Sequence, residues 1–135
     1  MSQKNVETVL KLAEAFNRGD LERLLSEWHP EGEYRAAIQQ VVEGEAGAFR
    51  GHDGLRRWWH ELHDLYDDLS VKVLEVRDFG EQVVVVLVIH GRGKGSGVAL
   101  DTPLAQALTI RQGKVTQACD YFSVDDALEA VGLAE

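Results

Sequence analysis

Asp120 and Gln106 are the polar residues whose types and spacing best suit chemistry in this sequence. They fall in two predicted strands, about Val98 to Ile110 and Val115 to Phe122, joined by the compact loop Arg111-Gln112-Gly113. A carboxylate among apolar side chains suits a general base, and a glutamine amide can donate a hydrogen bond to a carbonyl or a developing oxyanion. With a three-residue hairpin loop, one face of the hairpin holds Leu104, Gln106, Leu108, Ala118, Asp120 and Phe122.

The register of this hairpin has an alternative. A two-residue turn at Gln112-Gly113 would pair Ala105 with Asp120 and move Gln106 to the other face. We prefer the three-residue loop because it places the bulky apolar residues of both strands on one face. Asp120 could also be a solvated carboxylate at the rim or the partner of an arginine, and Gln106 could be a hydrogen-bonded polar group of the core.

Three other patterns resemble functional motifs and are set aside. His60, His63 and Asp64 have a metal-like spacing, but they lie on the polar face of an amphipathic helix, which is usually solvated. The glycine-rich tract 91–97 lacks the spacing of a phosphate-binding loop and joins two strands. Cys119 has no base placed beside it, so we expect a buried free thiol. The sequence therefore predicts no metal site.

Three amphipathic helices are expected to precede the strands. Apolar residues recur at helical spacing over residues 3–17, from Leu21 to Trp28, and again after Gly54. His29-Pro30 should end the second helix, because the residue before a proline leaves the α region.

The second half of the chain has the period of strands. Residues 71–76, the continuous run from Val83 to Ile89, and the hairpin strands follow one another, and Ser123 begins a last short helix. Glu33 to Arg50 is predicted to form a strand, a loop and a short second strand. Helices packed on one side of a mainly antiparallel sheet make an α+β fold.

Length and charge restrict the class of protein. The chain has 135 residues, so we treat residues 1–135 as one domain. Lys and Arg total 14 against 23 Asp and Glu, and this net charge of -9 disfavours nucleic acid and membrane as partners. One cysteine excludes an intramolecular disulfide, and no stretch has the character of a signal peptide or membrane span, so we expect a cytoplasmic protein.

Several short blocks along the chain resemble one family, the SnoaL-like polyketide cyclases of the ketosteroid isomerase and nuclear transport factor superfamily. The resemblance implies a single SnoaL-like domain in which a cone-shaped, curved sheet wraps around a long helix and leaves an open, mostly apolar pocket. This superfamily includes isomerases, aldol-type cyclases, epoxide hydrolases and binding proteins, so the fold does not fix the function. The blocks are Phe16-Asn17-Arg18-Gly19-Asp20-Leu21, Phe49-Arg50-Gly51-His52-Asp53-Gly54, Gly91-Arg92-Gly93-Lys94-Gly95-Ser96-Gly97, Arg111-Gln112-Gly113-Lys114-Val115 and Ala127-Leu128-Glu129-Ala130-Val131-Gly132-Leu133.

The resemblance also implies positions in the pocket. Ketosteroid isomerases use an aspartate base with a tyrosine and a protonated aspartate. These positions fall at Ala36, Leu12 and near Gln106, so none of the three groups is retained. Tyr34 has the parity of Ala36 and could offer its hydroxyl to the pocket, or it could hydrogen-bond at the edge. The residues expected to contact a ligand are Leu12, Tyr34, Ala36, Trp59 (or Trp58), Leu104, Leu108, Ala118 and Phe122.

We expect from this combination a pocket for a small apolar molecule. If the protein is an enzyme, it is a cofactor-free isomerase or cyclase that transfers a proton on a carbonyl compound, with Asp120 as base and Gln106 as polariser. A non-catalytic binding module with the same pocket is the alternative, and a structural role is the third. The missing acid at Ala36 favours the binding module and the structural role, whereas Asp120 in an otherwise apolar pocket favours the enzyme. Epoxide hydrolysis ranks lower because Arg35 lies off the pocket parity.

The run from Val83 to Ile89 predicts a homodimer. An ordinary one-sided strand alternates apolar and polar residues, whereas this one is apolar on both faces. One set fills the cone, and Val84, Val86 and Val88 would lie bare on the convex face, which usually marks an interface. In the alternative, the C-terminal helix covers this patch and the protein is a monomer.

Overall fold

The computed structural model describes residues 2–36 and 48–132. The predicted order of helices and strands is confirmed, and the loop predicted within Glu33 to Arg50 falls on residues 37–47, outside the described residues. In chain order the elements are α1 (Ser2–Arg18), α2 (Leu21–Ser26), β1 (Trp28–Arg35), β2 (Ala48–Arg50), α4 (Gly51–Leu65), β3 (Tyr66–Asp78), β4 (Gln82–Gly93), β5 (Ala99–Arg111), β6 (Lys114–Tyr121) and α5 (Val124–Ala130).

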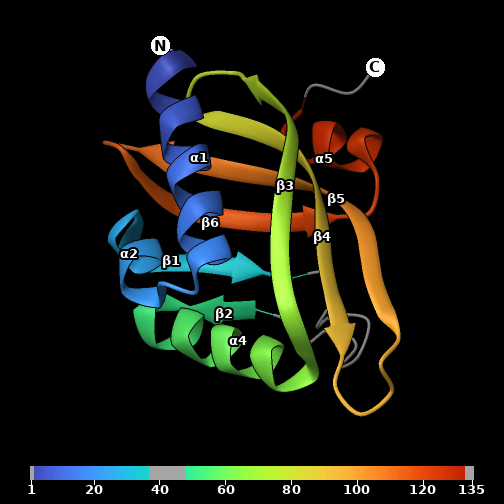
Figure 1. The fold of residues 1–135 in the computed structure, drawn as a ribbon. Helices are drawn as coiled ribbons and strands as arrows, with labels where there is room; N and C mark the ends of the chain where they lie inside the picture. Colours follow the sequence, from blue (N-terminus) through green and yellow to red (C-terminus); the bar gives the residue numbers. More distant parts are fainter. Residues whose placement is uncertain (1, 37–47, 133–135) are drawn as a thin grey trace.

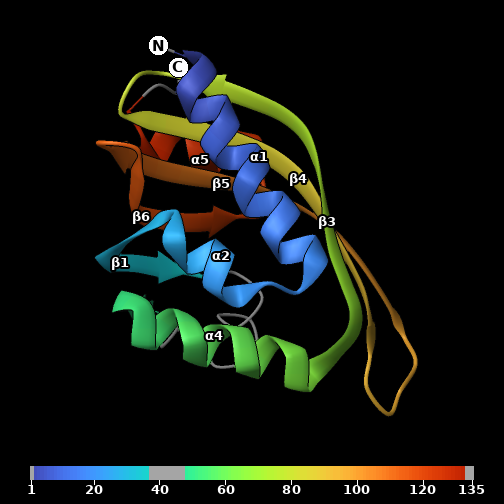
Figure 2. The same ribbon diagram turned by 60° about the vertical axis from the view of Figure 1, so that its left-hand side comes forward.

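A six-stranded sheet in the order β2-β1-β6-β5-β4-β3 forms the body of the fold. β1 and β6 run parallel, and the other paired strands run antiparallel. Figures 1 and 2 show the sheet curling around α1, with α2 and α4 on the same concave side. This is the predicted α+β fold, a mainly antiparallel curved sheet around a long helix.

The main core lies between the concave face of the sheet and these three helices. Alternate residues of β4 point into it, and Val83 and Val85 are almost fully buried. Leu55 and Leu62 of α4 belong to the same core cluster and are as deeply buried. The core therefore joins the helices to the middle of the sheet.

α5 packs on the opposite, convex face of the sheet, which corrects the expectation that all helices lie on one side (Figure 1). Its Ala127 contacts Val84 and Ala105 in a second apolar cluster, and all three are buried. The predicted N-cap is confirmed, because the Ser123 hydroxyl accepts a hydrogen bond from the Asp126 backbone N–H at 3.1 Å. α5 thus covers part of the apolar convex face.

The second helix ends earlier than the sequence predicts. α2 stops at Ser26, and Trp28 begins β1 with its ring buried in the core. Pro30 consequently lies inside a strand. The ladder between β1 and β6 is interrupted between Trp28 and Glu33, and a proline, which has no N–H to donate, fits such an interruption.

The hairpin between β5 and β6 turns over two residues, so the three-residue loop was wrong. Gln112 and Gly113 both have positive φ, 52° and 78°, as in the two-residue turns whose twist matches that of paired strands. Arg111 accordingly pairs with Lys114.

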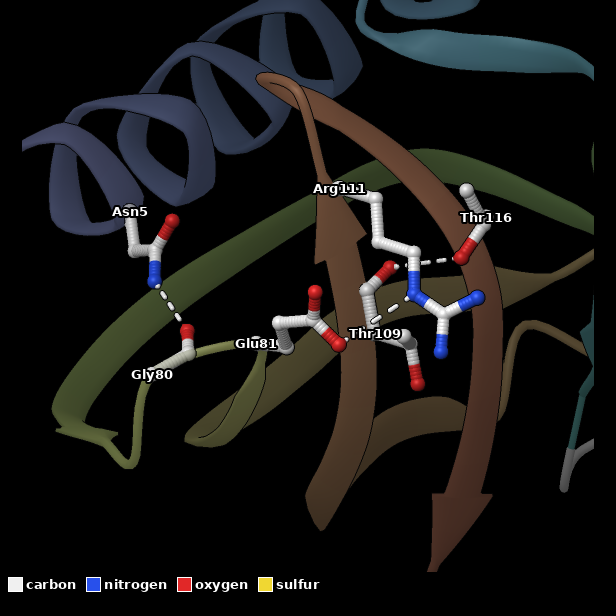
Figure 3. A network of polar contacts seen from close by, with 6 residues as sticks. All are labelled: Asn5, Gly80, Glu81, Thr109, Arg111 and Thr116. Carbon is white, nitrogen blue, oxygen red and sulfur yellow. Dashed lines mark hydrogen bonds and ion pairs between the residues drawn. The ribbon is translucent and has the colours of Figure 1, made fainter.

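A bulge in β6 preserves the predicted face nonetheless. Thr116 is the extra residue, and its hydroxyl donates to the Thr109 carbonyl at 3.3 Å (Figure 3). Beyond the bulge Gln106 pairs with Asp120, two residues from the predicted partner Ala118. Because side chains alternate with a period of two, a shift of two residues leaves the shared face unchanged.

Two asparagines tie α1 to the sheet near its ends. The Asn5 amide donates to the Gly80 carbonyl at 2.7 Å (Figure 3) and to an Asp78 carboxylate oxygen at 3.1 Å. The Asn17 amide donates to the Val71 carbonyl at 3.0 Å and accepts from the Val71 N–H at 2.7 Å. These bonds fix the middle of α1 above the concave face.

Candidate functional site

The concave side of the fold contains a cavity of about 100 Å³. Side chains from α1, α2, α4 and five strands line it, and almost all of them are apolar. Among the described residues, the polar side chains of the lining are Tyr34, Gln106 and Asp120. Of the residues predicted to contact a ligand, the lining includes Leu12, Tyr34, Ala36, Leu104, Leu108 and Ala118.

The three polar side chains form one hydrogen-bonded group. The Tyr34 hydroxyl donates to Asp120 Oδ2 at 2.7 Å, and Gln106 Nε2 donates to Asp120 Oδ1 at 2.9 Å. Gln106 Nε2 also lies 3.4 Å from the Tyr34 hydroxyl oxygen, as a longer contact. The carboxylate is therefore held through both of its oxygens.

The sheet order explains why these residues meet. β1, β6 and β5 are neighbours, and Gln106 pairs directly with Asp120. Tyr34 pairs with Ala118 across the parallel ladder, and Ala118 has the same parity as Asp120. All three side chains therefore leave the sheet on its concave face.

Burial governs the chemistry of this group. Tyr34 and Asp120 are each only 6% exposed. Burial, followed by the charge of Asp120 and the hydrogen bond to it, raises the pKa of Tyr34 well above its usual value of 10.0. Tyr34 therefore keeps its proton, and keeps donating it to Asp120, far into the alkaline range.

Aromatic rings pack around the tyrosine. Trp58 of α4 meets the Tyr34 ring edge-on with 5.1 Å between centroids, and Trp28 packs against it at 6.0 Å. Both tryptophans also line the cavity. Trp28 was missed as a cavity residue because its spacing from Leu21 and Leu24 continues a helical stripe.

Two residues of the predicted ligand set lie elsewhere. Of the adjacent pair on α4, the one at the cavity is Trp58, whereas Trp59 stacks on His63 at 4.4 Å and meets Phe16 edge-on at 5.7 Å. Phe122 is 55% exposed, because β6 ends at Tyr121 and the chain turns away toward α5. Trp59 and Phe122 therefore do not join the cavity lining.

No group of His, Cys, Asp and Glu within residues 2–36 and 48–132 has an arrangement that could hold a metal ion. Within the same ranges, no helix is both long and apolar enough to cross a membrane. His63, from the histidine pattern set aside above, places Nδ1 2.8 Å from the Trp59 carbonyl oxygen.

The curled sheet and the helix inside it define the ketosteroid isomerase-like and NTF2-like class of folds, as the structural neighbours confirm. The chain belongs to the SnoaL-like domain family, whose profile matches residues 9–118. The resemblance noted from the sequence is thus confirmed. No curated protein sequence matches the chain.

Solved structures of similar fold cover nearly the whole chain. An NTF2-like protein of unknown function from Burkholderia pseudomallei K96243 has a TM-score of 0.80 at 22% identity, covering 98% of both chains. TerC, co-crystallised with polyporic acid, has a TM-score of 0.78 at 23% identity, covering 96% of this chain and 97% of its own. A candidate polyketide cyclase from Xanthomonas campestris pv. campestris has a TM-score of 0.71 at 19% identity, covering 98% of both.

Proposed function

We propose that the protein is a cofactor-free isomerase or cyclase that transfers a proton on a small, mainly apolar carbonyl compound. The observation that carries this proposal is the buried Asp120 carboxylate at the polar end of an otherwise apolar cavity. Membership of the SnoaL-like family supports the reaction class. Asp120 is the proposed base.

The reaction needs only one proton carrier. Asp120 removes a proton from the carbon beside the carbonyl, which leaves an enolate. In an isomerisation, Asp120 returns that proton to another carbon of the same molecule. In an aldol-type cyclisation, the enolate carbon attacks a second carbonyl of the substrate, and Asp120 protonates the resulting alkoxide.

Tyr34 and Gln106 act in this proposal as positioning residues. Their hydrogen bonds to the two Asp120 oxygens fix the plane of the carboxylate, which supports a defined approach to the substrate. Gln106 was expected to polarise a carbonyl, but its amide is directed at Asp120. The role we propose for Gln106 is therefore to orient the base.

A structural relative supports a small organic ligand. TerC, whose fold is similar, was co-crystallised with polyporic acid. Trp28 and Trp58 give this cavity large, flat apolar walls, which favour contact with a ring compound.

Asp120→Asn tests the proposed base without a known substrate. The variant keeps the shape of the side chain, and we expect it to lose about 10²–10⁴-fold of any proton transfer. The assay measures deuterium exchange beside the carbonyl of cyclohexanone and 2-hydroxycyclohexanone in D₂O by NMR. Asp64→Asn, the same substitution at an exposed carboxylate of α4 outside the cavity lining, is the matched control and should retain exchange. Equal exchange rates in the wild-type protein and the Asp120→Asn variant would remove Asp120 as the base.

A non-catalytic binding module is the second candidate. It is favoured by the engagement of Asp120, both of whose oxygens accept hydrogen bonds from the protein. A ring compound that binds the wild type while showing no exchange above the Asp120→Asn rate would favour this candidate.

We also propose that a second copy of the chain is the partner of the convex face. α5 buries Val84, whereas Val86 and Val88 on the same face of β4 are only half-buried. Glu75 and Lys72 of β3 pair with these two valines, and Glu75 also holds an ion pair with Arg77 at 2.8 Å, so charges of both signs flank them. A copy in the opposite orientation meets complementary charges, as a two-fold contact requires.

Val86→Lys tests this interface. The lysine would place a charge in the apolar contact, so a species of about twice 15.0 kDa should become a monomer in light scattering. A wild-type mass of 15.0 kDa at micromolar concentration would refute the dimer.

A further inference from the structure

The hydrogen-bond donors at the polar end of the cavity are directed at one another. The Tyr34 hydroxyl donates to Asp120 at 2.7 Å. The Gln106 amide nitrogen, which carries two N–H groups, lies 2.9 Å from Asp120 and 3.4 Å from the Tyr34 oxygen. The side-chain donors of Tyr34 and Gln106 are therefore engaged inside the protein.

The chemistry of the partners fixes these directions. An ionised carboxylate only accepts hydrogen bonds, so the nitrogen rather than the oxygen of the Gln106 amide must face Asp120. Tyr34 keeps its proton because burial and the Asp120 charge raise its pKa. Both donors are thus committed to the carboxylate.

This end of the cavity therefore offers hydrogen-bond acceptors to a ligand. No hydrogen bond among the described residues ends on the Gln106 amide oxygen, and the Tyr34 oxygen retains lone-pair capacity beside it. The described lining contains no Lys, Arg or His, so a negatively charged ligand would meet no compensating charge there.

We propose that the cavity selects its ligand through a hydrogen-bond donor, a hydroxyl or enol O–H directed at the Tyr34, Gln106 and Asp120 oxygens. A ligand of the same shape that presents only a carbonyl oxygen to this group would face oxygen lone pairs, and accommodating it would break the Gln106–Asp120 bond. This inference rests on the proposed function and narrows its substrate class to hydroxylated or enolic compounds.

Cyclohexanol and cyclohexanone form the test pair, because they have nearly the same shape and only the alcohol is a donor. Isothermal titration calorimetry measures both affinities, and the fluorescence of Trp28 and Trp58 at the cavity gives a second readout. A hydrogen bond to a charged acceptor predicts that the alcohol binds about 10- to 100-fold more tightly.

Three variants test whether the cavity binds a ligand through its hydrogen-bond acceptors or through its donors. Asp120→Asn replaces one acceptor oxygen by an amide NH₂, which donates. The ratio of the affinities for cyclohexanol and cyclohexanone should therefore fall to about one or reverse. Tyr34→Phe should still bind cyclohexanol more tightly than cyclohexanone. If the Tyr34 hydroxyl instead donated a hydrogen bond to the carbonyl of the ligand, this variant would lose affinity for cyclohexanone. Val73→Ala, at an apolar part of the lining, should shift both affinities together.

The outcomes distinguish the inference from the proposed function. Equal affinities of the wild type for the two compounds, or tighter binding of the ketone, would overturn the inference and leave the proposed pocket intact. Binding of neither compound at millimolar concentration would overturn both. If Asp120→Asn does not fold, the wild-type ratio and the Tyr34→Phe result still decide the matter.

Discussion

The hydrogen bond from Tyr34 to Asp120 predicts a stability difference that shrinks in alkali. At neutral pH, Tyr34→Phe removes a 2.7 Å bond to a buried carboxylate. Hydrogen bonds to charged groups contribute about 1.5–3 kcal/mol, so the variant should lose about that much free energy of unfolding. Guanidinium denaturation followed by tryptophan fluorescence measures the loss.

The pH dependence follows from the raised pKa of Tyr34. The contribution of protonated Tyr34 to the free energy of unfolding is fully present below pH 10.0, which is the pKa of tyrosine in the unfolded chain. It is lost as the pH rises toward the pKa of Tyr34 in the folded state. Between pH 9 and pH 11 the unfolded tyrosine ionises while the folded one does not, which lowers the wild-type free energy of unfolding by about 1.4 kcal/mol. The pKa of Tyr121 is raised to about 12, mainly by burial, but Tyr121 is present in both proteins and cancels.

The difference in free energy of unfolding between the wild type and Tyr34→Phe should therefore narrow by about 1.4 kcal/mol from pH 9 to pH 11. Spectrophotometric titration of the folded wild-type and Tyr34→Phe proteins gives an independent check: both should ionise the same number of tyrosines up to pH 11, because folded Tyr34 keeps its proton. Parallel stability curves for the two proteins over this range would refute the assignment of Tyr34 as a buried, protonated donor.

Further substitutions test the scaffold by chemical denaturation. Asn17→Ala removes two hydrogen bonds to the Val71 backbone and should cost about 1–3 kcal/mol; an unchanged midpoint would show that α1 does not depend on them. Ser123→Ala removes the cap on the Asp126 N–H and should cost about 1 kcal/mol, and no loss would mean that α5 contributes little to stability. Val84→Asp puts a carboxylate beneath α5 and should lower the midpoint strongly, whereas near-wild-type stability would mean that α5 leaves the convex face readily.

The sequence predicted the face of the hairpin correctly through a register that was wrong. The φ values of Gln112 and Gly113 favour the two-residue turn, which by itself moves Gln106 off the face of Asp120. The bulge at Thr116 moves it back. A bulge of this kind leaves no compositional signal, so the shared face was predicted correctly only because the errors in loop length and in strand register cancelled.

The other differences also arise from tertiary contacts. Trp58 and Trp59 are adjacent and equally buried, so their burial does not tell which ring meets Tyr34 at the cavity. Phe122 has the parity of a cavity residue but lies beyond the last paired residue of β6. The fold class could be predicted because hydrophobic periodicity and turn residues act locally. The hydrogen bonds of Tyr34 could not, since they require the parallel pairing of distant strands.

That parallel pairing has a consequence for how the protein acquires its site during synthesis. Tyr34 and Asp120 are separated by 86 positions in the chain, and the strands that carry them lie side by side. β1 therefore leaves the ribosome long before β6, its parallel neighbour, and the entropy of closing so long a loop must be overcome in the same step that completes the sheet. A nascent chain has helices and hairpins available early, whereas the carboxylate and its tyrosine come together only when folding is nearly finished. Binding capacity and the fully folded state should therefore appear together, with no partly folded species that already recognises a ligand.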